Sequence, residues 1–170
     1  PNSKGSEART LPGIVLLRVS KMTGSVEGLF VSRQGGVPKG MVESVQITTN
    51  GCIGDRQNDL KHHGGPTRAV CLMSTDVMER LQAEGHPIAG GTTGENLLIR
   101  GIVWNELDIG TILMTEHVKL RITGDAPPCK TIKASFVQEN FMALSHKKTP
   151  QQTRWYAEVL QEGMMHRGES

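Results

Sequence analysis

The sequence predicts a mainly β protein, a single-domain β-barrel or packed β-sheets, with a few peripheral helices. Short apolar or alternating segments recur between turn residues, the 170 residues include 20 glycines, and strands do not alternate regularly with helices. The length suits one domain with a core and is short for two. We expect residues 13–170 to form this domain after a flexible segment, residues 1–12, which is polar and without pattern.

The expected strands are short segments bounded by turn residues. The clearest alternates Val118, Leu120 and Ile122 with polar residues, as a strand with one wet face does. Another ends at Asn50-Gly51, a dipeptide typical of tight turns. The expected strands are residues 13–19, 44–49, 69–73, 95–101, 110–115 and 118–123.

A first helix is expected over residues 74–85. Ser74 or Thr75 would cap its start, acidic residues follow in its first turn, and Gly85 would end it. Apolar residues recur on one face between these signals, which indicates packing against a sheet.

A second helix is expected over residues 151–163, near the end of the chain. Trp155 and Val159 are four residues apart, as are the two residues that follow them, so both pairs would share a helix face. Residues 133–145 fit a helix or an irregular segment equally well, and the pattern does not decide between them.

Composition excludes several classes of function. A net charge of +2 and an aromatic content of 4% do not resemble a nucleic-acid footprint, which clusters basic residues among aromatics. The sequence contains no apolar run of the roughly 18 residues that a membrane helix needs, and no signal peptide is visible. Three unpaired cysteines argue against a disulfide framework, so we expect a cytoplasmic protein without nucleic-acid or membrane partners.

A first candidate motif is "GCIGDRQNDLKHHGG", residues 51–65. A Gly-Gly pair lets main-chain N–H groups approach an anion, and nearby arginine and histidine side chains add charge and donors. An Asx-rich surface loop is an alternative, and a zinc site formed by Cys52, His62 and His63 is another, although their spacing is not standard. The candidate residues here are Asp55, Arg56, His63, Gly64 and Gly65.

A second motif is "GGTTGENLLIRG", residues 90–101. Hydroxyls flanked by glycines at the start of a strand could bind a phosphate through main-chain donors, but the motif lacks the spacing of a Walker A loop or a dinucleotide fingerprint. A tight loop that needs positive φ angles explains it equally well. The candidate residues are Thr93, Gly94, Glu95 and Asn96.

The third motif is "GDAPPCKTI", residues 124–132. Two prolines make the chain that enters Cys129 stiff, and Lys130 favours the thiolate, the form that attacks electrophiles and binds metals. No nucleophile signature of a hydrolase surrounds Cys129, whereas a thiolate acting as a soft metal ligand needs no partner base. A turn that contains a cysteine by chance is the alternative.

Taken together and in this order, these stretches resemble the MOSC domain family, and most of all its small stand-alone members of the hydroxylaminopurine-resistance type. The family also includes the C-terminal domain of molybdenum cofactor sulfurases. The resemblance extends from about residue 13 to residue 170. It rests on "GIVLLRVS", "GDRQNDLKHHGGPTRAV", "GTTGENLLIRGI", "LDIGTILMTEHVKLRIT", "PPCKTI" and "RWYAEVL".

The resemblance implies a β-rich barrel of the MOSC type that binds molybdenum cofactor (molybdopterin). Cys129 would be the molybdenum ligand, or the cysteine that carries transferable sulfur. Donors and cations would hold the pterin and its phosphate. These would be the candidate residues of the first two motifs, together with Lys130. Among them, His63, Gly64 and Gly65 match the family's His-Gly-Gly loop. Gly94, Glu95 and Asn96 match the start of its Gly-Glu-Asn strand.

Three functions follow from the resemblance. The first is reduction of an N-hydroxylated small molecule, with electrons from a separate donor protein. The second is a sulfur carrier, in which Cys129 takes sulfur as a persulfide from a donor protein and passes it to a metal centre. The third is a non-catalytic interaction domain. No pyridoxal-phosphate site is expected within this chain.

Overall fold

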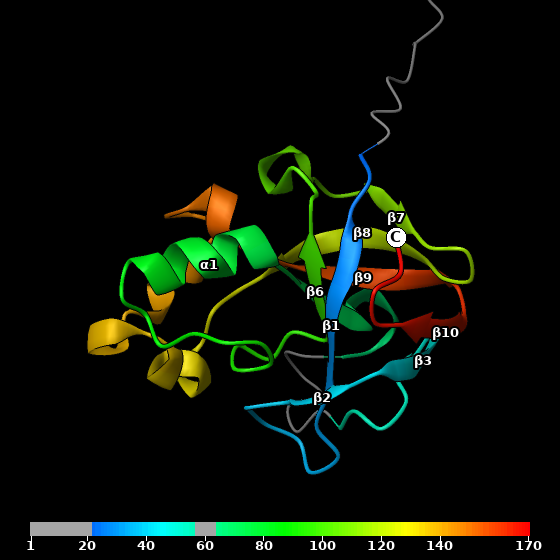
Figure 1. Ribbon diagram of the computed structural model, residues 1–170, viewed down its shortest axis with the longest axis horizontal. Helices are drawn as coiled ribbons and strands as arrows, with labels where there is room; N and C mark the ends of the chain where they lie inside the picture. The colour runs from blue at the N-terminus through cyan, green and yellow to red at the C-terminus, as the bar shows by residue number, and fades with distance from the viewer. Residues whose placement is uncertain (1–21, 57–63) are drawn as a thin grey trace, which may run out of the picture.

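The computed structural model describes residues 22–56 and 64–170. Over these residues the protein is mainly β, with one α-helix and several short 3-10 turns (Figure 1). The strands are β1 (Ser25–Val31), β2 (Gly40–Val42), β3 (Ser44–Thr48), β4 (Gly51–Cys52), β5 (Val70–Ser74), β6 (Leu97–Arg100), β7 (Ile112–Met114), β8 (Lys119–Ala126), β9 (Arg154–Gln161) and β10 (Gly163–His166). The helix is α1 (Thr75–Ala83), and the 3-10 turns are η1 (Pro66–Arg68), η2 (Trp104–Glu106), η3 (Lys130–Ser135), η4 (Val137–Glu139), η5 (Phe141–Leu144) and η6 (Pro150–Gln152).

The strands form two sheets. The larger has seven strands in the order β2-β1-β6-β5-β9-β8-β7, and the smaller has the order β10-β3-β4. Within the described residues no pairing joins the ends of either sheet. The single-domain, mainly β prediction is therefore confirmed, with two packed sheets, whereas the predicted barrel is not.

The predicted first helix is present as α1. The Ser74 hydroxyl accepts a hydrogen bond from the Val77 N–H at 3.2 Å, and the chain leaves the helix through Gly85 at a positive φ of 93°. The helix connects β5 to β6, which pair in parallel, whereas the other neighbours in the large sheet are antiparallel. The described part of the chain therefore contains one β-α-β unit, although the sequence showed no repeating pattern of this kind.

The predicted second helix is wrong, because residues 154–161 form strand β9. This strand lies between β5 and β8 and is buried on both faces, so no polar face marks it as a strand. Trp155 and Val159 both belong to the main core, and a spacing of four residues is common to a helix face and a strand face. Residues 133–145, which the sequence left open, form the 3-10 turns η3, η4 and η5.

The other strand predictions are confirmed with shifted boundaries, except residues 13–19, which lie outside the described residues. The segment 110–115 contains the shorter β7, and 118–123 contains the start of β8, which continues to Ala126 and delivers the chain to the third motif. The sequence missed β1, β2, β4 and β10.

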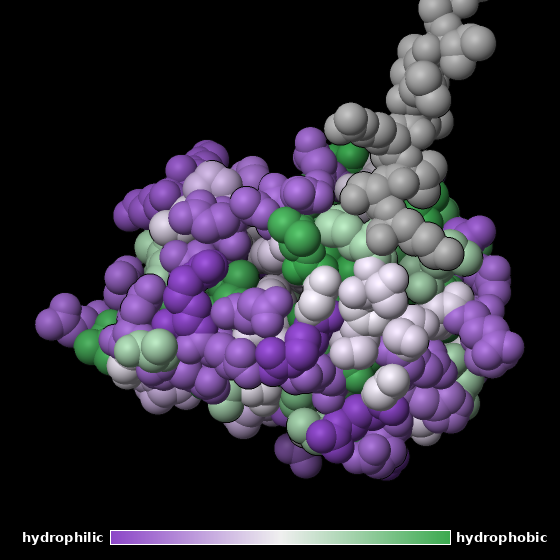
Figure 2. Space-filling view, turned by 45° about the horizontal axis from the view of Figure 1, so that its top comes forward, coloured by the Kyte–Doolittle hydropathy of each residue, from purple (hydrophilic) through white to green (hydrophobic). Residues whose placement is uncertain are grey.

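One main core lies between the sheets and under α1. Its most buried members come from different elements, which include Leu29 of β1, Ile47 of β3, Leu72 of β5, Leu81 of α1 and Leu97 of β6. Helix α1 and the turns after residue 130 gather at one end of the molecule, while β3 and β10 lie at the other (Figure 1). The face drawn in Figure 2 is mainly hydrophilic, with apolar residues gathered in its upper part. No helix within the described residues is long and apolar enough to span a bilayer.

Candidate functional site

Strands β5 and β9, together with the segments that precede β2, precede β6 and follow β8, enclose a small pocket of about 90 Å³ that contains the Cys129 thiol. Strand register brings them together. Strand β9 pairs with β5 and β8, placing Tyr156 opposite Cys71 and Arg154 opposite Ala126. The pocket is lined by Val37, Lys39, Cys71, Thr93, Gly94, Asn96, Cys129, Thr131, Ile132, Arg154 and Tyr156.

Cys129 stands at the junction between β8 and η3. After Ala126 the chain passes through the two prolines, and Cys129 keeps an extended backbone (φ −129°, ψ 166°) as the residue that precedes η3. Its half-buried sulfur lies 2.7 Å from the Thr131 hydroxyl oxygen, which is the polar partner of the thiol. Lys130 is exposed and does not line the pocket, so the sequence-based role for this lysine finds no support in its position.

Arg154 connects the second motif to the third. Its side chain is 4% exposed and donates to the carbonyl oxygens of Thr93, Ala126 (3.3 Å) and Pro127 (3.2 Å). Its Nε has no hydrogen-bond partner among the described residues. These three partners are neutral carbonyls, and a guanidinium keeps its charge when buried, so Arg154 contributes positive charge to the pocket wall.

A network around Asp55 supports the opposite wall. Its carboxylate, 3% exposed, accepts from the Lys39 ammonium at 2.6 Å, the Asn96 amide at 2.8 Å and the Ser32 N–H at 2.8 Å. Asp55 therefore orients Lys39 and Asn96, which line the pocket, without lining it itself. Separating this buried ion pair would leave a buried charge unpaired, which is strongly destabilising. The pair and its additional donors therefore hold the Lys39 side chain in place.

Asn96 fixes the position of β5 beside the pocket. Its side-chain oxygen accepts from the Cys71 N–H at 3.1 Å, while its main-chain N–H donates to the Cys71 carbonyl at 2.8 Å. Its amide nitrogen also donates to the Phe30 carbonyl of β1 at 3.1 Å. One asparagine thus links three strands of the sheet, which explains why this position needs both a donor and an acceptor.

Glu95 is fully buried and holds the second motif in its turn. Its carboxylate accepts from the Gly91 N–H at 2.5 Å and the Thr93 hydroxyl at 2.7 Å. A Cβ on Gly91 would lie 2.2 Å from the Lys39 carbonyl oxygen, so glycine permits the loop that carries Lys39 to pack here. The structure therefore gives Glu95 a structural role in the loop that supports the pocket.

Cys71 and Tyr156 face each other across β5 and β9 and pack together with Ala126. Burial raises the pKa of the Cys71 thiol, with Arg154 opposing this effect. Burial also raises the pKa of the Tyr156 phenol, and the nearby Cys71 adds to the rise. Both groups are therefore neutral near neutral pH, and neither supplies a charge to the pocket.

The structure brings together only part of the predicted site. Cys129, Thr93, Gly94 and Asn96 line the pocket. Asp55 and Glu95 support it from behind. The predicted residues that do not line it are Arg56, Gly64, Gly65 and Lys130, and His63 lies outside the described residues.

Sequence reasoning missed several lining residues, above all Lys39, Cys71, Arg154 and Tyr156. Lys39 follows a Gly-Gly-Val-Pro turn, and this lysine in a tight loop was a usable signal. Sequence reasoning missed Arg154 because its segment, residues 151–163, was predicted as a helix. No group of three or more potential metal-binding side chains exists in the described part of the chain, and the zinc alternative involves His62 and His63, which are not described.

Comparisons with known proteins give consistent results. The MOSC domain profile matches residues 59–170. The uncharacterized protein YflK of Bacillus subtilis (strain 168) is 30% identical over 117 residues, which cover 68% of this chain and 52% of YflK. The chain thus spans about half the length of this curated relative.

Solved structures share the fold at low sequence identity. The crystal structure of YiiM from Geobacillus stearothermophilus matches with a TM-score of 0.64 and 18% identity, covering 86% of this chain and 73% of that one. The YUAD protein of Bacillus subtilis matches with a TM-score of 0.65 and 14% identity, covering 88% and 94%. These similarities establish the fold, and the family follows from the profile.

Proposed function

This chain belongs to the MOSC domain family, and from that premise we propose that it binds molybdenum cofactor with Cys129 as the molybdenum ligand and reduces N-hydroxylated compounds. The observation that carries the proposal is the half-buried Cys129 thiol in a pocket whose walls hold the cations of Lys39 and Arg154. A thiolate is a soft ligand suited to such a metal, and cations favour an anionic group beside it.

The residues fit the cofactor in part. The donor set suits the metal end, because it offers one thiol, the Arg154 cation with neutral carbonyl partners, and the ammonium of the Lys39–Asp55 ion pair. The volume of about 90 Å³ is well below the roughly 300 Å³ at which small-molecule sites begin. The pterin and its phosphate would therefore extend beyond this pocket, and the pocket itself would receive only the end bound to Cys129.

When bound, the cofactor would supply two-electron transfer to the substrate. The chain's own residues would orient the Cys129 thiol and stabilise the walls of the pocket around it. The prolines before Cys129 restrict the direction of its thiol, and the Thr131 hydroxyl lies close enough to donate to a thiolate. Arg154 holds the carbonyls on either side of the pocket in place, and Asp55 keeps Lys39 directed towards it. Electrons would come from a separate donor protein in the cytoplasm.

The test is the molybdenum and pterin content of protein made in cells that synthesise the cofactor and purified without air. We expect near-stoichiometric molybdenum that is lost in Cys129→Ser and retained in Cys52→Ser, since Cys52 is buried away from the pocket lining. Equal molybdenum in both variants would exclude Cys129 as the ligand. No molybdenum in the unmodified protein would reject the proposal.

A sulfur carrier is the second candidate, and the small pocket favours it, because a persulfide adds only one sulfur atom to Cys129. Sulfur would come from a donor protein and pass to a metal centre. Mass spectrometry of the intact protein, incubated with a persulfide donor, would show one added sulfur that is absent from Cys129→Ser. Persulfide without pterin would favour this candidate over the first, and an unreactive thiol without either would leave a non-catalytic interaction domain.

A further inference from the structure

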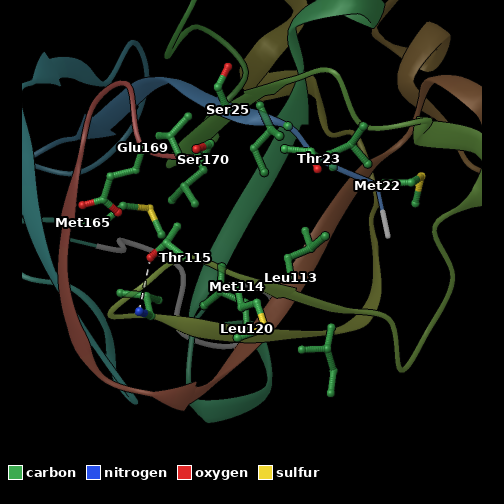
Figure 3. A pocket seen from close by; sticks show the side chains of 17 residues that line it. Met22, Thr23, Ser25, Leu113, Met114, Thr115, Leu120, Met165, Glu169 and Ser170 are labelled. Carbon is green, nitrogen blue, oxygen red and sulfur yellow. Dashed lines mark hydrogen bonds between the residues drawn. The ribbon is translucent and has the colours of Figure 1, made fainter. Parts of the chain in front are cut away.

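A second and larger cavity lies between the start of β1 and the β7–β8 hairpin, and it shares no lining residue with the Cys129 pocket. This groove has a volume of about 550 Å³ and is mainly apolar. Sites for small molecules commonly have volumes of about 300–1,000 Å³ and largely apolar walls, so the groove has the size and character of such a site. Figure 3 shows Met22 and Leu113 at one end of it and Thr115, Met165 and Glu169 at the other.

The wall of the groove is apolar and adaptable. Strand β6 contributes Leu97 and Ile99, and three methionines, Met22, Met114 and Met165, also line it. A methionine side chain is unbranched and flexible, so it packs against bodies of different shape. Such a wall favours an apolar ligand without fixing its outline.

Glu169 gives the groove its charge. Among the 17 described residues that line the groove, Glu169 alone carries an ionisable side chain. Its Oε2 atom is buried and has no hydrogen-bond partner within the described part of the chain. A buried carboxylate oxygen without a donor is costly, so a donor group belongs beside it.

Strand β1 holds Glu169 in this position. The Val26 N–H donates to the Glu169 carbonyl at 2.7 Å, and the Gly168 N–H donates to the Val26 carbonyl at 2.7 Å. Because these two hydrogen bonds fix the main chain at Glu169, the carboxylate stays at one end of an otherwise apolar groove.

We propose that the groove binds a small amphipathic amine, with its ammonium against the Glu169 carboxylate and its apolar body along Ile99 and Leu113. An ammonium supplies both a compensating charge and several donors, and hydrogen bonds between charged groups are stronger than those between neutral groups. An anion of the same shape would meet the Glu169 charge with no cation in the lining to offset it. The site therefore selects organic cations, and it does not depend on the function proposed for Cys129.

The experiment adds octylamine, below the concentration at which it forms micelles, to the full chain and follows the backbone amides by NMR. We expect saturable shifts at Leu113, Thr115 and Met165, with a Kd of about 1 mM or tighter. Shortening the alkyl chain should weaken binding about fourfold for each methylene removed from the groove. Octanoate, with a similar chain and the opposite charge, should bind at least about tenfold more weakly.

Glu169→Gln keeps the shape of the side chain and removes its charge, so it should bind octylamine at least about tenfold more weakly. The matched control is Glu116→Gln, because the Glu116 side chain is 85% exposed in the β7–β8 hairpin and does not line the groove. This control should bind octylamine within about twofold of the unmodified chain. The amide of Ala157 in central strand β9 shows in each variant that the domain is folded.

The absence of saturable shifts at the groove in the unmodified chain would overturn the proposal. Equal affinity for octylamine and octanoate would overturn it as well, because the apolar wall alone would then account for binding. An unchanged affinity in Glu169→Gln, or an equal loss in Glu116→Gln, would overturn the recognition of the ammonium by Glu169.

Discussion

Arg154 offers the sharpest test of how the pocket is held together. Replacing it with methionine keeps a long side chain of similar reach and removes the charge and every donor. The carbonyls of Thr93, Ala126 and Pro127 would then lose the group that connects them. These carbonyls belong to the second and third motifs, so the substitution would remove hydrogen bonds that position the chain on both sides of the pocket.

The magnitude follows from these contacts. Hydrogen bonds from a charged donor contribute about 1.5–3 kcal/mol each, but they are not additive and removal of a buried cation relieves part of its desolvation cost. We therefore expect Arg154→Met to lower the free energy of unfolding by about 3–4 kcal/mol. Arg154→Lys keeps the charge but not the planar array of donors, and should cost about 2 kcal/mol.

The assay is urea unfolding, with Arg121→Met as the matched control on the neighbouring strand. Arg121 is 46% exposed and pairs with Glu158 at 2.7 Å, and a surface ion pair contributes only about 0–1 kcal/mol. Cys129 should also be alkylated faster in Arg154→Met, since the carbonyl of Pro127 is no longer held. A cost below about 1 kcal/mol for Arg154→Met, or one equal to that of the control, would refute this account of the pocket.

The remaining predictions concern a glycine, an exposed ion pair and a buried thiol. Gly91→Ala should cost more than about 2 kcal/mol in thermal unfolding because its Cβ would overlap a carbonyl oxygen, whereas Gly110→Ala, also at positive φ but in open space, should cost about 1 kcal/mol. The Arg100 guanidinium, through its hydrogen bond, lowers the pKa of Glu79. The small stabilisation from the Glu79–Arg100 pair should therefore be present above the pKa of Glu79 in the unfolded chain, and should be lost as the pH falls through its pKa in the folded protein. In an NMR titration of Arg100→Ala, the pKa of Glu79 should be higher than in the unmodified protein. An unchanged pKa would contradict the pairing. Burial raises the pKa of Cys52 to about 12, so it should resist alkylation at pH 8 until the protein unfolds, and labelling of the folded protein would disprove its burial.

The local sequence pattern was sufficient to predict an element where one of its faces is exposed to solvent. The alternation of Val118, Leu120 and Ile122 correctly predicted a strand, and the cap and stop residues correctly predicted α1. Strand β9 was predicted as a helix because it is buried on both faces, and Trp155 and Val159 are separated by a spacing that both structures share. In such a segment, the neighbouring strands decide the conformation, and they are distant in sequence.

For the site, the sequence identified the motif residues that line the pocket, because glycine turns, prolines and a cysteine carry local signals. Cys129, Thr93, Gly94 and Asn96 were found in this way. It also nominated Arg56 and Lys130, which are exposed and lie outside the lining. Charge near a motif in sequence does not determine the direction in which a side chain points.

The sequence by itself determined the mainly β class, the helix α1 and the three motifs, because period, caps and turn chemistry act over a few residues. Only the tertiary structure placed Arg154 and Lys39 beside Cys129. The register of β9 against β8 brings Arg154 opposite Ala126, and the Asp55 carboxylate holds Lys39 from another loop. These contacts join residues far apart in the chain, so they exist only once the sheets have paired and packed.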